Sequence, residues 1–368
     1  MRPLTMAAAA AALLGLAGSA PAQTLDGLSW DEIEARAREE GTLTWYVWYL
    51  KDDLRRFVRA FTEETGIAVV IPEGTLAGNV LKLLAERRRG TGDIDVFSAG
   101  FDAFETLPAH DLFRSLDMLP PDEGRVRSLA GFDGGDRVLA FWGNQTGIAY
   151  DPARIDAAAL PQTPEDFAAF WTANPGRFGF NHENGGAGPS FFLSAIGAVA
   201  GLDYAASEAA PGALEAAEAG YAFFNAHAED YVITASNADG IIRVSDGELW
   251  MVPAWEDHLA GLQNRGEVRA DLAFYIPRMG MFGGGNGVAI PANARHPAAA
   301  AVFVDWLTSP ETQAALNARF GTAPMHEDAA AADALVPAAQ RANSRPWVLP
   351  PLRTELENRF VDEVILER

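Results

Sequence analysis

The chain has 368 residues, of which 49% are hydrophobic and 21% are charged, and these proportions exclude disorder over most of its length. This length exceeds what a single core usually supports, so it indicates two domains. The formal net charge of −22 disfavours binding to nucleic acid or to an anionic membrane surface. The sequence contains no cysteine, which excludes disulfides, zinc–thiolate and iron–sulfur sites, a cysteine nucleophile and a lipidated cysteine.

The first 22 residues have the pattern of a secretory signal peptide. Arg2 provides a positive charge, residues 6–18 form an uncharged and mostly apolar run, and residues 20–22 (APA) follow the small-x-small pattern of a cleavage site. The apolar run is shorter than the roughly 20 residues that a membrane-spanning helix needs. We therefore expect cleavage after Ala22 and an exported mature protein.

Three predicted strands alternate with two predicted helices in the first hundred residues. The first strand, residues 43–50 (LTWYVWYL), is a continuous apolar run, as expected for a parallel strand buried on both faces. The other strands are predicted at residues 67–71 and 94–97, and the two helices end at Gly66 and Gly90. This β-α-β-α-β order predicts the first half of a doubly wound α/β sheet. Right-handed crossovers place the loops after the three strands at one edge, where such sheets bind ligands.

Two of these loops carry side chains suited to ligand binding. Trp48 and Tyr49 end the first strand, and Ser98, Gly100 and Phe101 follow the third. Small residues let a ligand approach backbone N–H groups, and aromatic rings can stack on it. The alternative roles are core packing for the aromatic residues and an ordinary helix cap for Ser98.

The rest of the chain continues to alternate strands and helices. A glycine-rich loop at residues 182–190 (HENGGAGPS) precedes an apolar helix. Strands are predicted at residues 139–142, 148–150, 178–180, 248–255, 273–276 and 287–290, and helices from residue 164, at 190–202 and 213–226, from residue 256, and at 297–307, 311–320 and 352–366.

Taken in order, these segments resemble the extracellular solute-binding proteins of ABC importers, in particular the subgroup that includes polyamine, thiamine and ferric-ion receptors. The resemblance covers nearly the whole mature chain. The segments that carry it are residues 45–48 (WYVW), 93–98 (DIDVFS), 141–150 (FWGNQTGIAY), 247–250 (GELW) leading to Trp255, 286–291 (NGVAIP) and 300–313 (AAVFVDWLTSPETQ).

The resemblance implies a type II periplasmic binding protein-like α/β fold. Two doubly wound lobes are joined by two crossover strands, and they close around a ligand in the cleft between them. Lobe one is expected at residues 24–142 plus 286–328 and lobe two at residues 146–284 plus 329–368, with hinges near residues 142–148 and 284–287. Such a monomeric receptor captures a small polar solute in the periplasm and delivers it to an ABC permease in the inner membrane, without a cofactor and without being an enzyme.

The same resemblance identifies candidate aromatic contacts. Receptors of this kind place an aromatic residue at the end of the first strand, and a serine and an aromatic residue in the third loop. Trp255 matches the position of a ligand-stacking tryptophan in the polyamine receptors. The candidates are therefore Trp48, Tyr49, Ser98, Phe101, Trp142 on the first crossover, and Trp255.

The polar candidates are Glu183, Glu256, Asp257 and Asn286. Glu256 and Asp257 could face a cation or merely favour a helix N-terminus. Glu183 could meet a cation, whereas the glycines beside it could hold an anion at the following helix or form a plain surface loop. Asn286 stands where the polyamine receptors carry a carboxylate, and residues 282–285 (FGGG) replace an aromatic residue found there, so the chain departs from the polyamine pattern.

The sequence indicates the class of ligand less directly than it indicates the fold. Aromatic residues beside carboxylates suit an organic cation, whereas the same rings with amide side chains suit a sugar, and a phosphate ester is a further alternative. Ferric-ion receptors of this kind carry adjacent tyrosines near the end of lobe two. The seven tyrosines of this chain include no such pair, so ferric ion is a less favoured ligand. An exported hydrolase is the remaining alternative, but the six histidines have no short metal-binding spacing, so no metal site is expected, and residues 188–190 lack the closing glycine of a nucleophile elbow.

Overall fold

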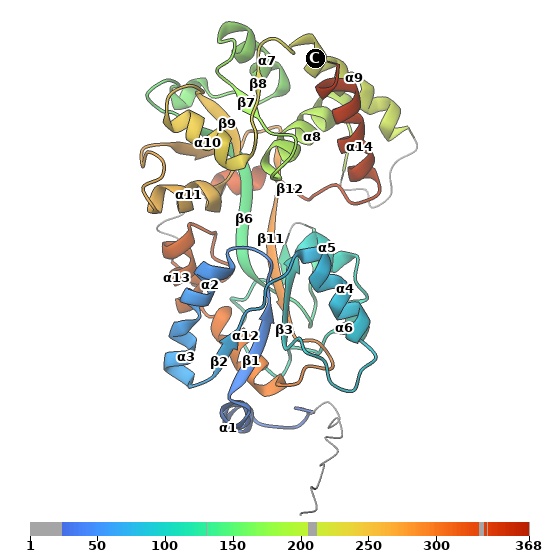
Figure 1. Ribbon diagram of the computed structural model, residues 1–368, viewed down its shortest axis with the longest axis vertical. Helices are drawn as coiled ribbons and strands as arrows, with labels where there is room; N and C mark the ends of the chain where they lie inside the picture. The colour runs from blue at the N-terminus through green and yellow to red at the C-terminus, as the bar shows by residue number, and fades with distance from the viewer. Residues whose placement is uncertain (1–23, 130, 205–211, 331–334, 337, 368) are drawn as a thin grey trace, which may run out of the picture.

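The computed structural model describes residues 24–129, 131–204, 212–330, 335–336 and 338–367, so the predicted signal peptide lies outside the described residues. Figure 1 shows two lobes, one above the other, connected by long strands. Within the described part of the chain, every helix is too short or too polar to cross a membrane.

The buried hydrophobic residues of the described chain fall into three clusters. Two of them draw on residues 25–142 and 288–325, and we call this body lobe one. The third draws on residues 148–364, and we call this body lobe two. Each lobe therefore combines segments that are far apart in the sequence, since the chain passes from one lobe to the other and returns.

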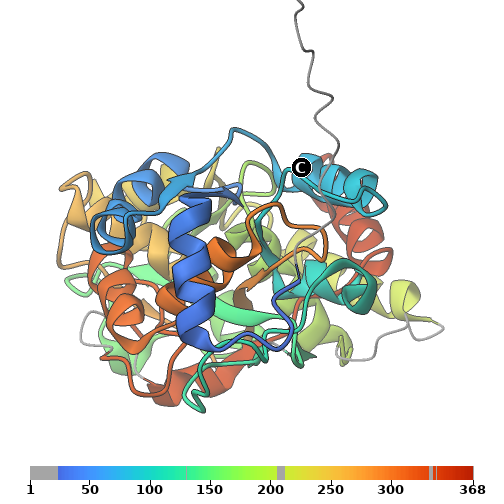
Figure 2. The same ribbon diagram turned by 90° about the horizontal axis from the view of Figure 1, so that it is seen from below.

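Lobe one is a sheet covered by helices. The strands Thr42–Tyr46, Ala68–Val70 and Val96–Gly100 are parallel, with the first paired to each of the other two. This arrangement confirms the β-α-β-α-β prediction. Its elements are α1 (Trp30–Glu40), β1 (Thr42–Tyr46), α2 (Lys51–Phe57), α3 (Arg59–Thr65), β2 (Ala68–Val70), α4 (Leu76–Glu86), β3 (Val96–Gly100), α5 (Phe101–Glu105), α6 (Ala109–Leu112), β4 (Ser128–Leu129), β5 (Phe132–Asp133), α12 (Pro297–Leu307) and α13 (Pro310–Phe320). Seen from below, α1 lies across the end of this lobe beside α12 (Figure 2).

The first predicted strand and helix differ from the structure in detail. β1 ends at Tyr46, the last residue paired with β3, so Trp48 and Tyr49 lie in the loop beyond the strand. Leu50 then has a φ of 44°, an unusual value for a residue with a side chain, and turns the chain into α2. The single predicted helix is divided at Val58 into α2 and α3.

Lobe two packs helices around shorter strands. Its elements are η1 (Ala157–Ala159), α7 (Pro164–Ala173), β7 (Gly179–Phe180), α8 (Ala187–Ala200), α9 (Ala213–Ala226), β8 (Val232–Ile233), α10 (Asn237–Ser245), β9 (Met251–Trp255), α11 (Glu256–Asn264), β10 (Ala273–Tyr275), η2 (Ala338–Asn343), β12 (Ser344–Arg345), α14 (Leu352–Phe360) and the π-helical turn η3 (Val361–Ile365). The C-terminal end of the chain lies in this lobe (Figure 1).

Two strands cross between the lobes. They are β6 (Leu139–Tyr150) and β11 (Met281–Ala289), which pair antiparallel with each other. In lobe one β11 also pairs with β3, and in lobe two β6 pairs with β9 and β10 while β11 pairs with β12. The sheet order is therefore β10-β6-β11-β3-β1-β2, which spans both lobes. The two strands predicted within residues 139–150 are one continuous strand, because pairing with β11 extends through the residues between them.

A third segment runs beside these crossover strands, and the sequence patterns did not indicate its pairing with β6. After α13 the chain pairs with β6 through Ala323, whose N–H donates to the Gly143 carbonyl at 2.9 Å and whose carbonyl accepts from the Gly143 N–H at 3.1 Å. A Cβ at Gly143 would meet the Ala323 backbone at 2.6 Å, so only glycine permits this approach. The chain then continues to η2 in lobe two.

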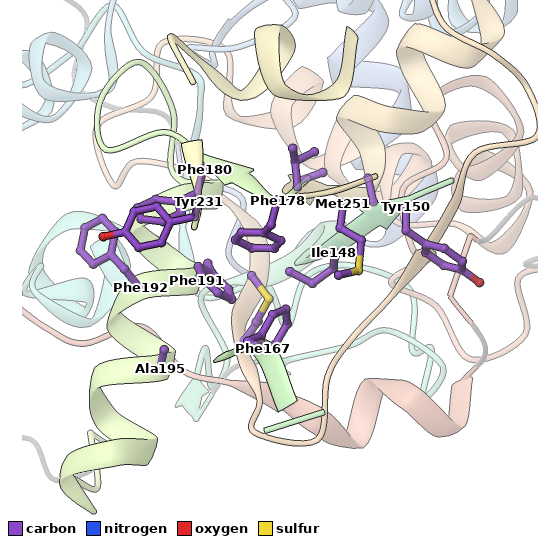
Figure 3. Packing of buried hydrophobic residues seen from close by; sticks show 14 of the residues in the cluster. Ile148, Tyr150, Phe167, Phe178, Phe180, Phe191, Phe192, Ala195, Tyr231 and Met251 are labelled. Carbon is purple, nitrogen blue, oxygen red and sulfur yellow. The ribbon is translucent and has the colours of Figure 1, made fainter. Parts of the chain in front are cut away.

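Aromatic rings fill the core of lobe two. Phe191 on α8 is fully buried, and its ring centroid lies 5.0 Å from that of Phe167 and 4.9 Å from that of Phe178. Figure 3 shows these rings grouped with Phe180 and Tyr231 near Ile148 of β6. The continuous apolar sequence of α8 is explained by this burial, since such a helix needs partners on all sides.

Phe191→Ala should leave a large cavity in this core, so we expect it to lower the free energy of unfolding by about 3–5 kcal/mol, measured by urea denaturation. Leu81→Ala is the matched control, because Leu81 is 68% exposed on α4 and should change stability by less than about 0.5 kcal/mol. Equal effects of the two substitutions would contradict the assignment of this core.

Candidate ligand-binding site

A cavity of about 730 Å³ lies between the lobes, beside the crossover strands. This volume is within the range of sites that enclose small molecules. Lobe one contributes the loop after β1, α2, α5 and α13, and lobe two contributes α11 and the segment after β12. The residues discussed below that line it are Trp48, Tyr49, Leu50, Asp53, Arg56, Phe101, Asp102, Glu105, Phe132, Gly186, Trp255, Asp257, His258, Gly261, Asn264, Arg265, Gly283, Gly284, Gly285, Asn286, Arg319, Phe320, Trp347 and Arg353.

Aromatic rings from both lobes form much of the cavity wall. Trp48 and Tyr49 meet edge to face with centroids 4.8 Å apart, as do Tyr49 and Trp142 at 5.2 Å. On the opposite lobe, Trp255 ends β9 and lies 6.1 Å from Trp347 with 33° between the ring planes. The sequence-predicted Trp48, Tyr49 and Trp255 are thus placed together around one cavity. Trp347 was missed, since it follows β12 in an irregular segment without a recognisable pattern.

Asp257 is the carboxylate that faces the aromatic wall. It lies in the first turn of α11, where Oδ2 accepts a hydrogen bond of 3.0 Å from Trp142 Nε1 and Oδ1 accepts one of 2.9 Å from the His258 N–H. Burial raises the pKa of Asp257 to about 6, and these two hydrogen bonds oppose the rise. Within the described residues, no lysine, arginine or histidine side chain forms an ion pair with this carboxylate.

Glu256 points away from the cavity, which corrects its assignment as a ligand contact. Its carboxylate is fully buried and accepts two hydrogen bonds from Arg341 of η2, at 3.0 and 2.8 Å. Burial raises the pKa of Glu256 to about 7, while Arg341 acts to lower it. Consecutive residues on a helix point about 100° apart, so the side chains of Glu256 and Asp257 lie on different sides of the first turn of α11. Glu256 anchors the start of α11, and Asp257 faces the site.

Two other predicted residues support the site from behind. Ser98 is buried, and its Oγ accepts a hydrogen bond of 2.8 Å from Trp45 Nε1, so it lies in the core of lobe one and outside the cavity. Trp142 is also fully buried, and it contacts the cavity lining through its hydrogen bond to Asp257 and its ring contact with Tyr49. It therefore positions the carboxylate of the other lobe instead of stacking on a ligand.

Glu183 is exposed and lies outside the cavity, contrary to the prediction. The chain turns at this loop because the Asn181 side-chain amide donates to the backbone carbonyls of Glu183 and Gly185, at 2.8 and 3.1 Å. The loop instead contributes Gly186, where a Cβ would lie 3.3 Å from the Trp255 ring. Its glycine content therefore makes room for an aromatic wall.

Phe101 and Asn286 do line the cavity. Phe101 is 1% exposed and packs edge to face against Phe132 with centroids 5.6 Å apart, so it offers little surface to a ligand. Asn286 is 6% exposed on β11, and its side chain lies near the buried Tyr49 hydroxyl, whose pKa burial raises well above its ordinary value. The Tyr49 hydroxyl is itself buried and forms no well-formed hydrogen bond within the described residues, and the Asn286 side chain is the polar group beside it.

Charged side chains at the cavity were largely missed by the sequence predictions. Four arginines and four carboxylates line it, so the cavity is balanced in charge although the whole chain is strongly acidic. Arg353 is already occupied, since its guanidinium lies 4.1 Å from the Trp347 ring centroid and pairs with Glu357 at 2.9 Å. Among the described residues no three histidine or acidic side chains gather in a way that could hold a metal ion.

Comparison with known proteins identifies the family. The model of the bacterial extracellular solute-binding protein family matches residues 56–343, which is more than half of the chain. No curated protein matches the sequence significantly.

Solved structures agree in fold. The spermidine/putrescine ABC transporter substrate-binding protein PotD from Streptococcus pneumoniae is similar with a TM-score of 0.63 and 14% identity, over 88% of this chain and 99% of that one. Iron-bound HitA from Pseudomonas aeruginosa has a TM-score of 0.61 and 22% identity, over 87% and 99%. The solute-binding protein RafE in complex with raffinose has a TM-score of 0.66 and 16% identity, over 87% and 94%.

These likenesses establish the type II periplasmic binding protein fold that the sequence predicted. The family match extends over both lobes and both crossover strands. Its members bind solutes for ABC transport systems and are binding proteins, not enzymes. The chain therefore belongs to the bacterial extracellular solute-binding proteins.

Proposed function

We propose that this protein captures a small organic cation in the periplasm and delivers it to an ABC permease in the inner membrane. The observation that carries this proposal is Asp257, a carboxylate at the cavity wall without a basic partner among the described residues. A half-buried carboxylate without a counter-ion is unfavourable, and a cationic group of a ligand would offset that cost.

The aromatic residues around Asp257 support the same ligand class. Trp48 and Tyr49 approach from lobe one and Trp255 from lobe two, so a cation beside Asp257 would contact several ring faces. Each such contact contributes about 0.5–2 kcal/mol. Spermidine and putrescine are named for PotD, a structural neighbour, which is consistent with an amine ligand although it shows only a shared fold.

Closure of the lobes would complete the site. Walls from the two lobes meet across residues 283–285 of β11, three glycines between the lobe-two and lobe-one parts of the strand. Glycines tolerate wide changes in φ and ψ, so we place the hinge here and at residues 143–145 of β6, opposite them. A ligand that contacts both lobes only when they are closed shifts the population towards that state.

We further propose that the signal peptide at residues 1–22 directs export and that the protein functions as a monomer. The family is extracellular, which supports a location outside the inner membrane. The closed form would be the one that the permease recognises.

A sugar is the second candidate ligand. Trp255 and Trp347 lie within 33° of parallel and present apolar surface on which a sugar ring could stack. A structural neighbour, RafE, was solved with raffinose. Neutral sugars would leave Asp257 without a counter-ion, which is why an organic cation is the first choice.

A thermal-shift screen of the mature protein against choline, thiamine, putrescine, glucose and raffinose distinguishes these ligands. We expect a cation to stabilise the protein, by about 2.7 kcal/mol at 100 times its Kd. Asp257→Asn should abolish the shift, whereas Asp246→Asn, an exposed residue after α10, should preserve it. Stabilisation by sugars alone, or a cation shift that survives Asp257→Asn, would overturn the cation proposal.

Binding of the cation should depend on pH. The pKa of Asp257 is raised to about 6 in the empty site, and the cation needs the ionised carboxylate. Affinity should therefore be constant well above pH 6 and fall by about tenfold per pH unit below it, measured by calorimetry between pH 4.5 and 8. In the Asp257→Asn protein the residual affinity should lack this dependence. An affinity that rises on acidification would contradict the role of Asp257.

Closure should reduce the radius of gyration measured by small-angle X-ray scattering when the stabilising cation is added. The Asp257→Asn protein at the same cation concentration serves as the control and should keep the radius of the free protein. Binding without any change in radius would contradict the closure mechanism.

A further inference from the structure

One face of α11 runs along the cavity with opposite charges at its two ends. Asp257, Gly261 and Arg265 are spaced four residues apart, so they lie on the same side of the helix, and all three line the cavity. Asp257 and Arg265 are eight positions apart, which separates their backbones by about 12 Å along the helix axis. Gly261 lies between them without a side chain, and the Arg265 guanidinium folds back beside it in this groove, with Nη1 3.2 Å from where a Cβ of residue 261 would stand.

The basic end of the groove also receives two arginines from lobe one. Arg56 of α2 and Arg319 of α13 line the cavity together with Arg265. The cavity-lining carboxylate near them is Asp53, whose Oδ1 lies 2.6 Å from Arg56 and 3.9 Å from Arg319. Arg265 pairs with Glu267, which is outside the cavity lining, at 2.5 Å. Three guanidinium groups therefore surround this end of the cavity with one lining carboxylate between them.

The other end of the cavity is acidic. Asp102 and Glu105 on α5 line it, on the opposite side of the crossover strands from α2, α11 and α13 (Figure 1). The Trp142 hydrogen bond holds Asp257 beside those strands, so Asp257 lies on the path from the basic to the acidic end. The cavity is thus polarised, although its charges sum to zero.

The helix macrodipole alone does not explain this arrangement. An acid at the start of α11 and a base at its end are stabilising in any helix. Arg56 and Arg319 stand in the last turns of α2 and α13, where the dipole of its own helix favours each of them, but no dipole accounts for the meeting of three helix ends from both lobes at one cavity. Their side chains are 50% and 57% exposed, so they remain accessible to a ligand.

We infer that the solute is a zwitterion, with a cationic group at Asp257 and a carboxylate or phosphate group held by Arg265, Arg319 and Arg56. This inference rests on the proposed capture of an organic cation and specifies the other end of the ligand. Guanidinium groups bind carboxylate and phosphate through paired hydrogen bonds. Because Arg265 belongs to lobe two and the other two arginines belong to lobe one, the anionic group would also hold the lobes together.

Isothermal titration of the mature protein with two matched sets of probes tests the inference. The first set is 8-aminooctanoate, octylamine and octanoate, and the second is phosphocholine, choline and inorganic phosphate. We expect at least one zwitterion to bind tenfold or more tightly than its matched amine, and the set to which it belongs distinguishes carboxylate from phosphate. The inference is rejected if octylamine and choline each bind as tightly as the zwitterion of the same set, or if none of the six probes binds.

Substitution of the arginines then tests whether they hold the anionic group of the ligand. Arg265→Gln and Arg319→Gln should each weaken the zwitterion about tenfold and change the affinity of the matched amine less than twofold. Arg243→Gln is the control, because Arg243 lies on α10 outside the cavity, where it pairs with Glu248. This substitution should leave both affinities unchanged. Unchanged melting temperatures would show that the variants are folded.

The failure of this inference can be separated from failure of the proposed function. If amines bind through Asp257 but both arginine substitutions have no effect, the cation receptor stands and the zwitterion is rejected. If Asp257→Asn leaves the affinities of the amines and the zwitterions unchanged, the proposed cation site itself is rejected.

Discussion

The antiparallel pairing of β6 with β11 is the constraint on which the rest of the structure depends. These strands share main-chain hydrogen bonds from one lobe to the other, so they hold both lobes in one sheet. Glycines make the pairing possible at the centre. A Cβ at Gly283 would overlap the Gln145 side chain, and Gly285 has a φ of 155° and lies against the Trp142 carbonyl. The same residues that permit close pairing also leave the cavity open beside them.

Contacts between the lobes follow from this arrangement. The strand register places Trp142 opposite Asn286, and the Trp142 indole N–H points towards α11. Trp142 donates to Asp257, and the Asn264 side chain donates to the Arg319 carbonyl at 3.4 Å. Polar contacts of this kind cost little to break in water, so they are compatible with lobes that open and close. The buried Glu256–Arg341 pair lies within lobe two and keeps α11 in place during such motion.

Charge at the site differs from charge on the whole chain. A net charge of −22 favours encounter with cations, but it says little about a cavity lined by equal numbers of arginines and carboxylates. The acidic surface attracts positively charged groups from a distance, whereas binding depends on the individual charges that line the cavity. Bulk charge and site charge are therefore separate properties of this receptor.

The sequence by itself determined the α/β class, the β-α-β-α-β order of lobe one and the family, because these depend on local periodicity and on the order of segments. It also indicated Trp48, Tyr49, Trp255 and Asp257, which follow or end a strand or begin a helix and which line the cavity. Only the tertiary structure separated Asp257 from Glu256, because the rotation of α11 about its axis depends on what packs against it. It also brought Arg56, Arg319 and Trp347 to one cavity from three distant segments, since contacts between such segments leave no local pattern in the chain.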